Sequence, residues 1–213
     1  MMFANRNQAA DRLATALEAY KGRNPLILAI PRGAVPMGQR LARALGGELD
    51  VVLVRKLRAP FNPEFALGSI DESGWSYIAD YAESAGGTPT YLAQEKQAQL
   101  DTIKKRRAQY TPLRPPIDPA GRIVIVVDDG LATGATMISA LHALRDRKPA
   151  RLICAVPVAP ADTVEKIRPY ADEVICLSTP MFFQAVGQFY ADFPQVDDVD
   201  VVDILREAGQ PAS

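Results

Sequence analysis

The 213-residue chain is poor in cysteine, histidine and tryptophan, with two, one and one of these residues. Cys154 and Cys176 lie inside apolar runs, so we expect two buried thiols rather than a disulfide or a metal site. No apolar run reaches the roughly 18 residues that a membrane span needs, and the N-terminus carries no secretory hydrophobic region. These absences predict a cytoplasmic location and exclude a membrane as partner.

An excess of charge of either sign is also lacking, since 24 basic residues face 25 acidic ones and the formal net charge is -1. This balance provides no overall attraction to nucleic acid, so we predict no nucleic-acid partner. The motif G-x-x-x-x-G-K-[ST] is absent as well, which argues against an ATP-binding P-loop. The composition, 48% hydrophobic and 23% charged, is ordinary for a globular enzyme.

Short apolar runs alternate with amphipathic segments along most of the chain. The apolar runs predict strands at 26–30, 51–54, 123–127, 152–156 and 174–177. The amphipathic segments predict helices at 7–20, at 134–147 and at 160–168, and a further helix that follows the segment 31–38 and ends at about residue 44. Strands and helices that alternate at this spacing form a mostly parallel sheet with helices on both faces. We therefore predict an α/β fold with five such strands and a single domain, 1–213.

Two segments interrupt this alternation. Residues 58–118 contain a predicted hairpin, with strands at 67–70 and 75–78, and a long polar helix at 91–110. We interpret 58–118 as an insertion over the sheet, whose loop-rich first half is a candidate lid. Residues 180–207 are aromatic and acidic and form a candidate hood or tail.

Several side chains in these segments allow two interpretations. The acids of the tail favour a solvated helix start over a metal site: Asp197, Asp198, Asp200 and Asp203. The aromatic residues of the tail favour packing over stacking on a ligand: Phe182, Phe183, Tyr190 and Phe193. A solvated helix face is favoured over a phosphate clamp for Lys104 to Arg107, and an exposed position for His142. Trp75 and Tyr77 could equally belong to a hairpin core or to a lid.

The most informative stretch runs from Ile123 to Thr136 and reads IVIVVDDGLATGAT. A buried strand ends in two carboxylates, Asp128 and Asp129, and a turn of small residues then leads into a helix. The amides of such a turn and the positive helix end can bind a phosphate. The carboxylates can accept hydrogen bonds from sugar hydroxyls or hold a hydrated Mg²⁺. This stretch therefore predicts a site for a sugar phosphate.

Ligands of open α/β sheets bind at the carboxyl ends of the strands, where the winding reverses. With the strand order 2-1-3-4-5, the loop after Ile30 would face the loop after Val127. The first loop, PRGAVPMG, offers Arg32 and the backbone of Gly33. Basic groups on one side and a phosphate turn on the other suggest a ligand that is phosphorylated at two places.

VIVVDDGLATGAT resembles the phosphoribosyl pyrophosphate (PRPP) signature of type I phosphoribosyltransferases, in which hydrophobic residues precede two acids and a loop ending T-G-x-T. IPRGAVPMG looks like the pyrophosphate loop of that family, and VRKL at 54–57 like the start of its mobile catalytic loop. The whole chain, with NPEFALGSI and AVGQFY, resembles a bacterial subgroup whose substrate is unassigned.

The resemblance assigns roles to particular residues. Residues at the positions of Ala132, Thr133, Gly134, Ala135 and Thr136 hold the 5-phosphate of PRPP. Asp128 and Asp129 match the acids that bind the ribose hydroxyls, often with Mg²⁺ nearby. Arg32, Gly33 and Ala34 would bind pyrophosphate after a Pro31–Arg32 peptide that is often cis in the family. Arg55 and Lys56 match catalytic basic residues near the leaving group.

The resemblance also implies an activity: transfer of the 5-phosphoribosyl group of PRPP to a small nitrogenous acceptor, for example a base, with Mg²⁺ and release of pyrophosphate. The family suggests a homodimer. Ala132 stands where 6-oxopurine enzymes commonly carry an aspartate base, which argues against hypoxanthine or guanine. A regulator that senses PRPP or a nucleotide without turnover remains the alternative. A phosphatase or kinase would need a nucleophile or an ATP loop, and neither is recognisable in the sequence.

Overall fold

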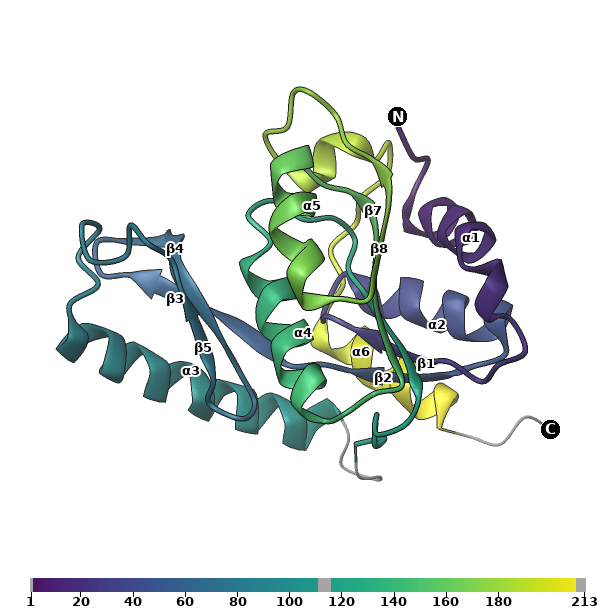
Figure 1. Ribbon diagram of the computed structural model, residues 1–213, viewed down its shortest axis with the longest axis horizontal. Helices are drawn as coiled ribbons and strands as arrows, with labels where there is room; N and C mark the ends of the chain where they lie inside the picture. The colour runs from purple at the N-terminus through teal and green to yellow at the C-terminus, as the bar shows by residue number, and fades with distance from the viewer. Residues whose placement is uncertain (1, 111–115, 210–213) are drawn as a thin grey trace.

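The computed structural model describes residues 2–110 and 116–209. Its central feature is a parallel sheet in the order β2-β1-β6-β7-β8 (Figure 1). The strands are β1 (Leu26–Ala29), β2 (Glu48–Val51), β6 (Ile123–Val127), β7 (Arg151–Val158) and β8 (Glu173–Ser178). The predicted order 2-1-3-4-5 is confirmed, and the winding reverses between β1 and β6.

Helices cover both faces of this sheet, as predicted. On one face lie α1 (Arg6–Ala16), α2 (Ala34–Leu45) and α6 (Asp198–Ala208); on the other lie α4 (Ala135–Asp146) and α5 (Ala161–Ile167). Short 3₁₀ turns occupy Glu18–Tyr20, Arg168–Tyr170 and Val186–Phe189. Successive strand residues point to opposite faces, so Ile125 and Val127 pack with α1 and α2 while Val124 and Val126 pack with α4.

Local sequence signals set the helix ends. The side chain of Asn5 caps α1 by accepting from the amide of Gln8, and Gly46, at a φ of 66°, ends α2 in the left-handed conformation. Asp197 and Asp200 form a capping box at the start of α6. The acidic tail is therefore a helix start, as predicted. Within the described residues, no helix has the length and apolarity to cross a membrane.

A second, antiparallel sheet contains β3 (Val54–Ala59), β4 (Asn62–Asp71) and β5 (Ser76–Ile78), and α3 (Pro89–Tyr110) follows it. Figure 1 shows this sheet and α3 beside the central sheet as an arm. The predicted hairpin and long helix are confirmed. The side chain of Ser69, which is fully buried, binds the carbonyl oxygen of Ala135 at 2.7 Å and thereby ties the arm to α4.

The predicted strand at 51–54 is wrong. The central strand β2 ends at Val51, and Val54 begins β3 of the second sheet. Val52 and Leu53 link the two sheets and are buried, so the apolar run continues through the connection and hides the break. Arg55 and Lys56 consequently lie inside an antiparallel strand and not at the end of a parallel one.

Two predictions of exposure are also wrong. His142 stacks on Trp75, with ring centroids 3.5 Å apart and an interplanar angle of 9°, so Trp75 packs the hairpin against α4. In the basic run of α3, Lys104 and Lys105 are exposed, but the Arg107 side chain turns inward. Its Nη2 atom lies 2.6 Å from an oxygen of Glu72.

The tail aromatics pack against one another, with one exception. Phe183 stacks on Phe189, and Tyr190 stacks on Phe193 with centroids 4.7 Å apart. Phe182 is 83% exposed, so the packing prediction is wrong for this residue. Both cysteines are free thiols, as expected; Cys154 is buried, whereas Cys176 is only partly buried.

Candidate functional site

Two turns meet at the carboxyl edge of the central sheet. Strands β1 and β6 pair in parallel, and Ala29 lies opposite Val127, so the turns that follow them leave the sheet side by side. A Cβ atom added to Gly33 would lie 2.2 Å from Oδ2 of Asp129. The backbone of the first turn therefore contacts the acids of the second, and only glycine leaves room for that contact.

Both turns lead into helices that lack a side-chain cap. Gly33 precedes α2, and Gly134, at a φ of 77°, precedes α4. The amides of residues 32–34 and 132–134 have no protein acceptor in the part of the chain that the structure describes. Unpaired amides at a helix N-terminus are suited to bind an anion. The site thus offers two adjacent turns whose free amides could accept an anion.

Backbone groups of the turn at residues 130–134 form hydrogen bonds with the neighbouring elements. The Leu131 amide donates to the carbonyl of Val158 at 2.9 Å, and the Thr163 hydroxyl donates to the carbonyl of Ala132 at 2.7 Å. A Cβ atom on Gly134 would lie 2.9 Å from Cγ2 of Thr163. Close packing by α5 therefore explains the glycine at position 134, and these hydrogen bonds hold the turn in place.

The two acids of the turn influence each other. Oδ1 of Asp128 accepts the amide of Asp129 at 2.8 Å. Burial raises the pKa of Asp128 well above its usual range and the charge of Asp129 adds to the rise, while Arg6 and Lys56 oppose it. Burial also raises the pKa of Asp129, against the opposing effect of Arg6. Two adjacent, partly buried carboxylates favour a nearby cation or hydroxyl donor.

Arg6 is the nearest cation to Asp129 and was missed by the sequence analysis. Its Nε and Nη2 atoms lie 3.0 and 2.9 Å from Oδ2 of Asp129. A signal was present, because Arg6 lies on the buried stripe of α1 with Ala9, Ala10 and Leu13. A charged residue on the apolar stripe of a helix needs a buried partner. That partner is 123 positions away in the sequence.

The predicted basic residues occupy different places. Arg32 is partly exposed, with Nη1 3.9 Å from Oδ1 of Asp197, and it follows a cis Pro31–Arg32 peptide, as the resemblance implied. Nε of Arg55 donates to Gln99 on α3 at 2.6 Å. Lys56 points to the opposite face of β3, and its charge lowers the pKa of Asp128. Arg55 is thus turned towards α3, whereas Lys56 is exposed and its charge acts on Asp128.

Two cavities flank the end of β6. One, of about 400 Å³, is lined by Arg6, Arg32, Gly33, Asp129 and residues 193–196.

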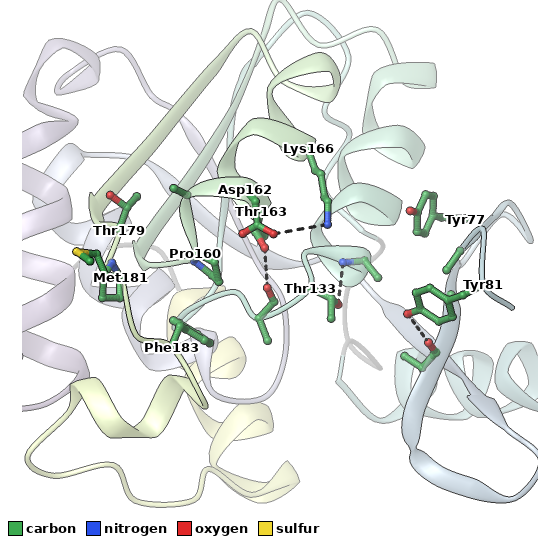
Figure 2. A pocket seen from close by; sticks show the side chains of 17 residues that line it. Tyr77, Tyr81, Thr133, Pro160, Asp162, Thr163, Lys166, Thr179, Met181 and Phe183 are labelled. Carbon is green, nitrogen blue, oxygen red and sulfur yellow. Dashed lines mark hydrogen bonds and ion pairs between the residues drawn. The ribbon is translucent and has the colours of Figure 1, made fainter. Parts of the chain in front are cut away.

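The other cavity, of about 570 Å³, lies between the turn at 132–135, α5, the arm and residues 179–183 (Figure 2). Its walls include Tyr77, Tyr81 and Phe183. Both volumes are typical of small-molecule sites.

The acids fit a hydrated magnesium ion rather than a closed metal site. Among the side chains that the structure describes, no cluster of three or more His, Cys, Asp or Glu could hold a metal. Mg²⁺ usually keeps several waters and binds one or two carboxylates together with substrate phosphates. Asp128 and Asp129 can supply those carboxylates if the ligand supplies the phosphate oxygens.

Comparison with known proteins agrees with this geometry. The phosphoribosyl transferase domain model matches residues 3–194. A provisionally named phosphoribosyl transferase of Mycobacterium tuberculosis is 39% identical over 210 residues, which cover 97% of this chain and 47% of that protein. The chain thus spans about half the length of the curated relatives that it matches.

The crystal structure of TT1426 from Thermus thermophilus superposes with a TM-score of 0.83 at 45% identity, covering 99% of this chain and 100% of that one. Together with the family model that covers most of the sequence, these likenesses place the chain in the phosphoribosyl transferase domain family.

Proposed function

We propose that the protein transfers the 5-phosphoribosyl group of PRPP to a small nitrogenous acceptor and releases pyrophosphate. The observation that carries this proposal is the pair of adjacent turns with unpaired amides, at 32–34 and 132–134, with two carboxylates between them. PRPP has a phosphate at one end, a pyrophosphate at the other and two ribose hydroxyls in between. Its functional groups match the turns and the acids in kind and in order.

In this proposal, the turn at 132–136 binds the 5-phosphate, and residues 32–34 bind the pyrophosphate. Asp128 and Asp129 bind the ribose hydroxyls and would hold a hydrated Mg²⁺, which supplies positive charge to the leaving oxygens. Lys56, whose charge acts on Asp128, would add a further positive charge. Departure of pyrophosphate leaves an electron-poor ribose carbon, so cations and amides beside the leaving group lower the barrier.

The acceptor would occupy the 570 Å³ cavity beside the turn. Its walls carry Tyr77, Tyr81 and Phe183, which suit a flat ring. Ala132 provides no general base, which favours an acceptor other than a 6-oxopurine. We also propose that 58–90, the first half of the insertion 58–118, covers the site as a lid and that 180–207 forms the hood, which would keep water from the reacting carbon.

A regulator that binds PRPP or a nucleotide without turnover is the alternative. The contact of Arg55 with Gln99 favours it, since that side chain is turned away from the leaving group in this conformation. The two functions differ in one product. An enzyme releases pyrophosphate from PRPP with at least one acceptor in a panel of bases and amines, whereas a regulator releases none with any of them.

The binding test uses the thermal unfolding midpoint of the full chain with PRPP and Mg²⁺. We expect PRPP to raise the midpoint in the wild type and in Asp146→Asn, which changes an exposed acid of α4. Asp128→Asn should abolish most of the rise, because it removes a carboxylate that faces the ribose and the ion. No rise in the wild type at millimolar PRPP would refute both candidate functions.

A further inference from the structure

Arg6 holds three groups from distant parts of the chain. Beside its two contacts with Asp129, its Nη1 atom donates to the carbonyl oxygen of Pro194 at 2.6 Å. The guanidinium also lies over the ring of Phe193, 3.8 Å from its centroid. The side chain is 10% exposed, so it is almost completely enclosed at the start of α1.

The guanidinium is not saturated by these contacts. It carries five N–H donors, and the described residues accept from Nε once, from Nη2 once and from Nη1 once. At least two N–H donors are therefore left for a ligand, and Arg6 lines the 400 Å³ cavity with Arg32 and Gly33. Two parallel N–H groups on one edge of a guanidinium match two oxygens of a phosphate group.

We propose that Arg6 is a further pyrophosphate-binding residue, which acts together with Arg32 and the amides of residues 32–34. This inference rests on the proposed function for the identity of the ligand. Asp129 and Pro194 hold the guanidinium in place at the wall of the cavity. Arg6 would then supply a permanent positive charge beside the leaving group, independent of Mg²⁺.

A purely structural role explains the arrangement less well. An enclosed ion pair is weak evidence for stability, because desolvation offsets much of its attraction. The glycine at position 33 provides a second argument. A Cβ atom there would lie 3.0 Å from Nη2 of Arg6 and 2.2 Å from Oδ2 of Asp129. The backbone of the first turn at Gly33 therefore lies directly against the ion pair of Arg6 and Asp129.

The test is calorimetric titration of the full chain with sodium pyrophosphate and, separately, with ribose 5-phosphate, both in EDTA. Arg6→Met should weaken pyrophosphate binding by roughly 10- to 100-fold, the effect of losing one charge-assisted contact. Arg6→Lys keeps the positive charge but lacks the paired N–H donors of a guanidinium, so its affinity for pyrophosphate should lie between those of the wild type and Arg6→Met. Arg12→Met, which changes an exposed arginine of the same helix, should bind like the wild type.

The ratio of the two losses separates direct contact from a structural role. If Arg6 only positioned Asp129, ribose 5-phosphate binding would fall at least as much as pyrophosphate binding, and the proposal would be overturned. A wild type that binds no pyrophosphate would overturn it as well. If Arg6→Met does not fold, Arg6→Lys gives the same comparison. Pyrophosphate binding that depends on Arg6, in a protein that ignores PRPP, would refute the proposed function and leave the anion site in place.

Discussion

The carboxyl end of β6 has two flanks, the β1 side and the β7 side, and the groups that could bind an anion differ between them. On the β1 side, two arginines and a carboxylate, Arg6, Arg32 and Asp129, line a cavity. On the β7 side, the turn at 132–136 has no charged side chain, and α5 packs against it so closely that Gly134 has no room for a Cβ atom. The first flank depends on paired charges and the second on backbone geometry. Substitutions of charge and of shape should therefore separate them.

The largest effect should come from unpairing the charged flank. Asp129→Asn removes the partner of Arg6 and leaves a nearly enclosed guanidinium uncompensated, so it should lower the free energy of unfolding by about 3 kcal/mol. Asp128→Asn, one residue away, removes a carboxylate whose ionisation is opposed by burial. It should leave the stability unchanged or raise it. Urea unfolding of the two variants tests this, and equal losses would contradict the contrast.

The neutral flank should depend on the hydrogen bond from Thr163 to the carbonyl of Ala132. Thr163→Val keeps the shape but leaves that carbonyl without its donor, at a cost of about 2 kcal/mol in unfolding free energy. Thr163→Ser keeps the hydroxyl and should retain most of the stability. PRPP binding should weaken in the valine variant alone. Equal behaviour of the two variants would show that the hydrogen bond does not shape the turn.

Two glycines with similar φ values separate the effect of crowding around a Cβ atom from the cost of the left-handed backbone conformation. Gly134 and Gly22 have φ values of 77° and 75°, but only Gly134 is crowded, since nothing lies within 4 Å of a Cβ atom at Gly22. Substitution by alanine should cost each about 1 to 2 kcal/mol for the left-handed conformation. Gly134→Ala should also lose PRPP binding, measured by calorimetry, while Gly22→Ala should keep it.

The smallest effect concerns pH. Because burial raises the folded-state pKa of Asp128 above its ordinary 3.8, the folded protein binds a proton more tightly than the unfolded chain does. The stability that this tighter proton binding contributes is fully present below pH 3.8 and is lost as the pH rises through the folded-state pKa of Asp128. The free energy of unfolding should fall by less than about 1.4 kcal/mol per pH unit. Unfolding free energies across this range should decline less steeply in Asp128→Asn. An unchanged slope would show that Asp128 is not the group that titrates.

The sequence predicted the central sheet well, because each of its strands is a short apolar run next to an amphipathic helix. It failed at Val51–Val54, where a buried connection between two sheets is as apolar as a strand. The local sequence pattern does not distinguish a buried connection from a buried strand. This error placed Arg55 and Lys56 at the end of a parallel strand, whereas they lie inside an antiparallel one.

The turn amides and the signature acids were recognisable, because their neighbours in the sequence position them. Arg6, Arg107 and His142 were not, since the partners of their side chains lie on distant elements. Arg6 bonds to Asp129 across 123 positions and Arg107 to Glu72 across 35. Contacts of this kind depend on how the elements pack, which residue spacing within one element cannot show.

The central claim, that one ligand bridges the two flanks, is tested most directly by a crystal structure with PRPP and Mg²⁺ in the absence of an acceptor. We predict the pyrophosphate within hydrogen-bonding distance of Arg6, Arg32 and the amide of Gly33, and the 5-phosphate against the amides of 132–136. Phosphate groups gathered on one turn alone, or bound away from both, would contradict it.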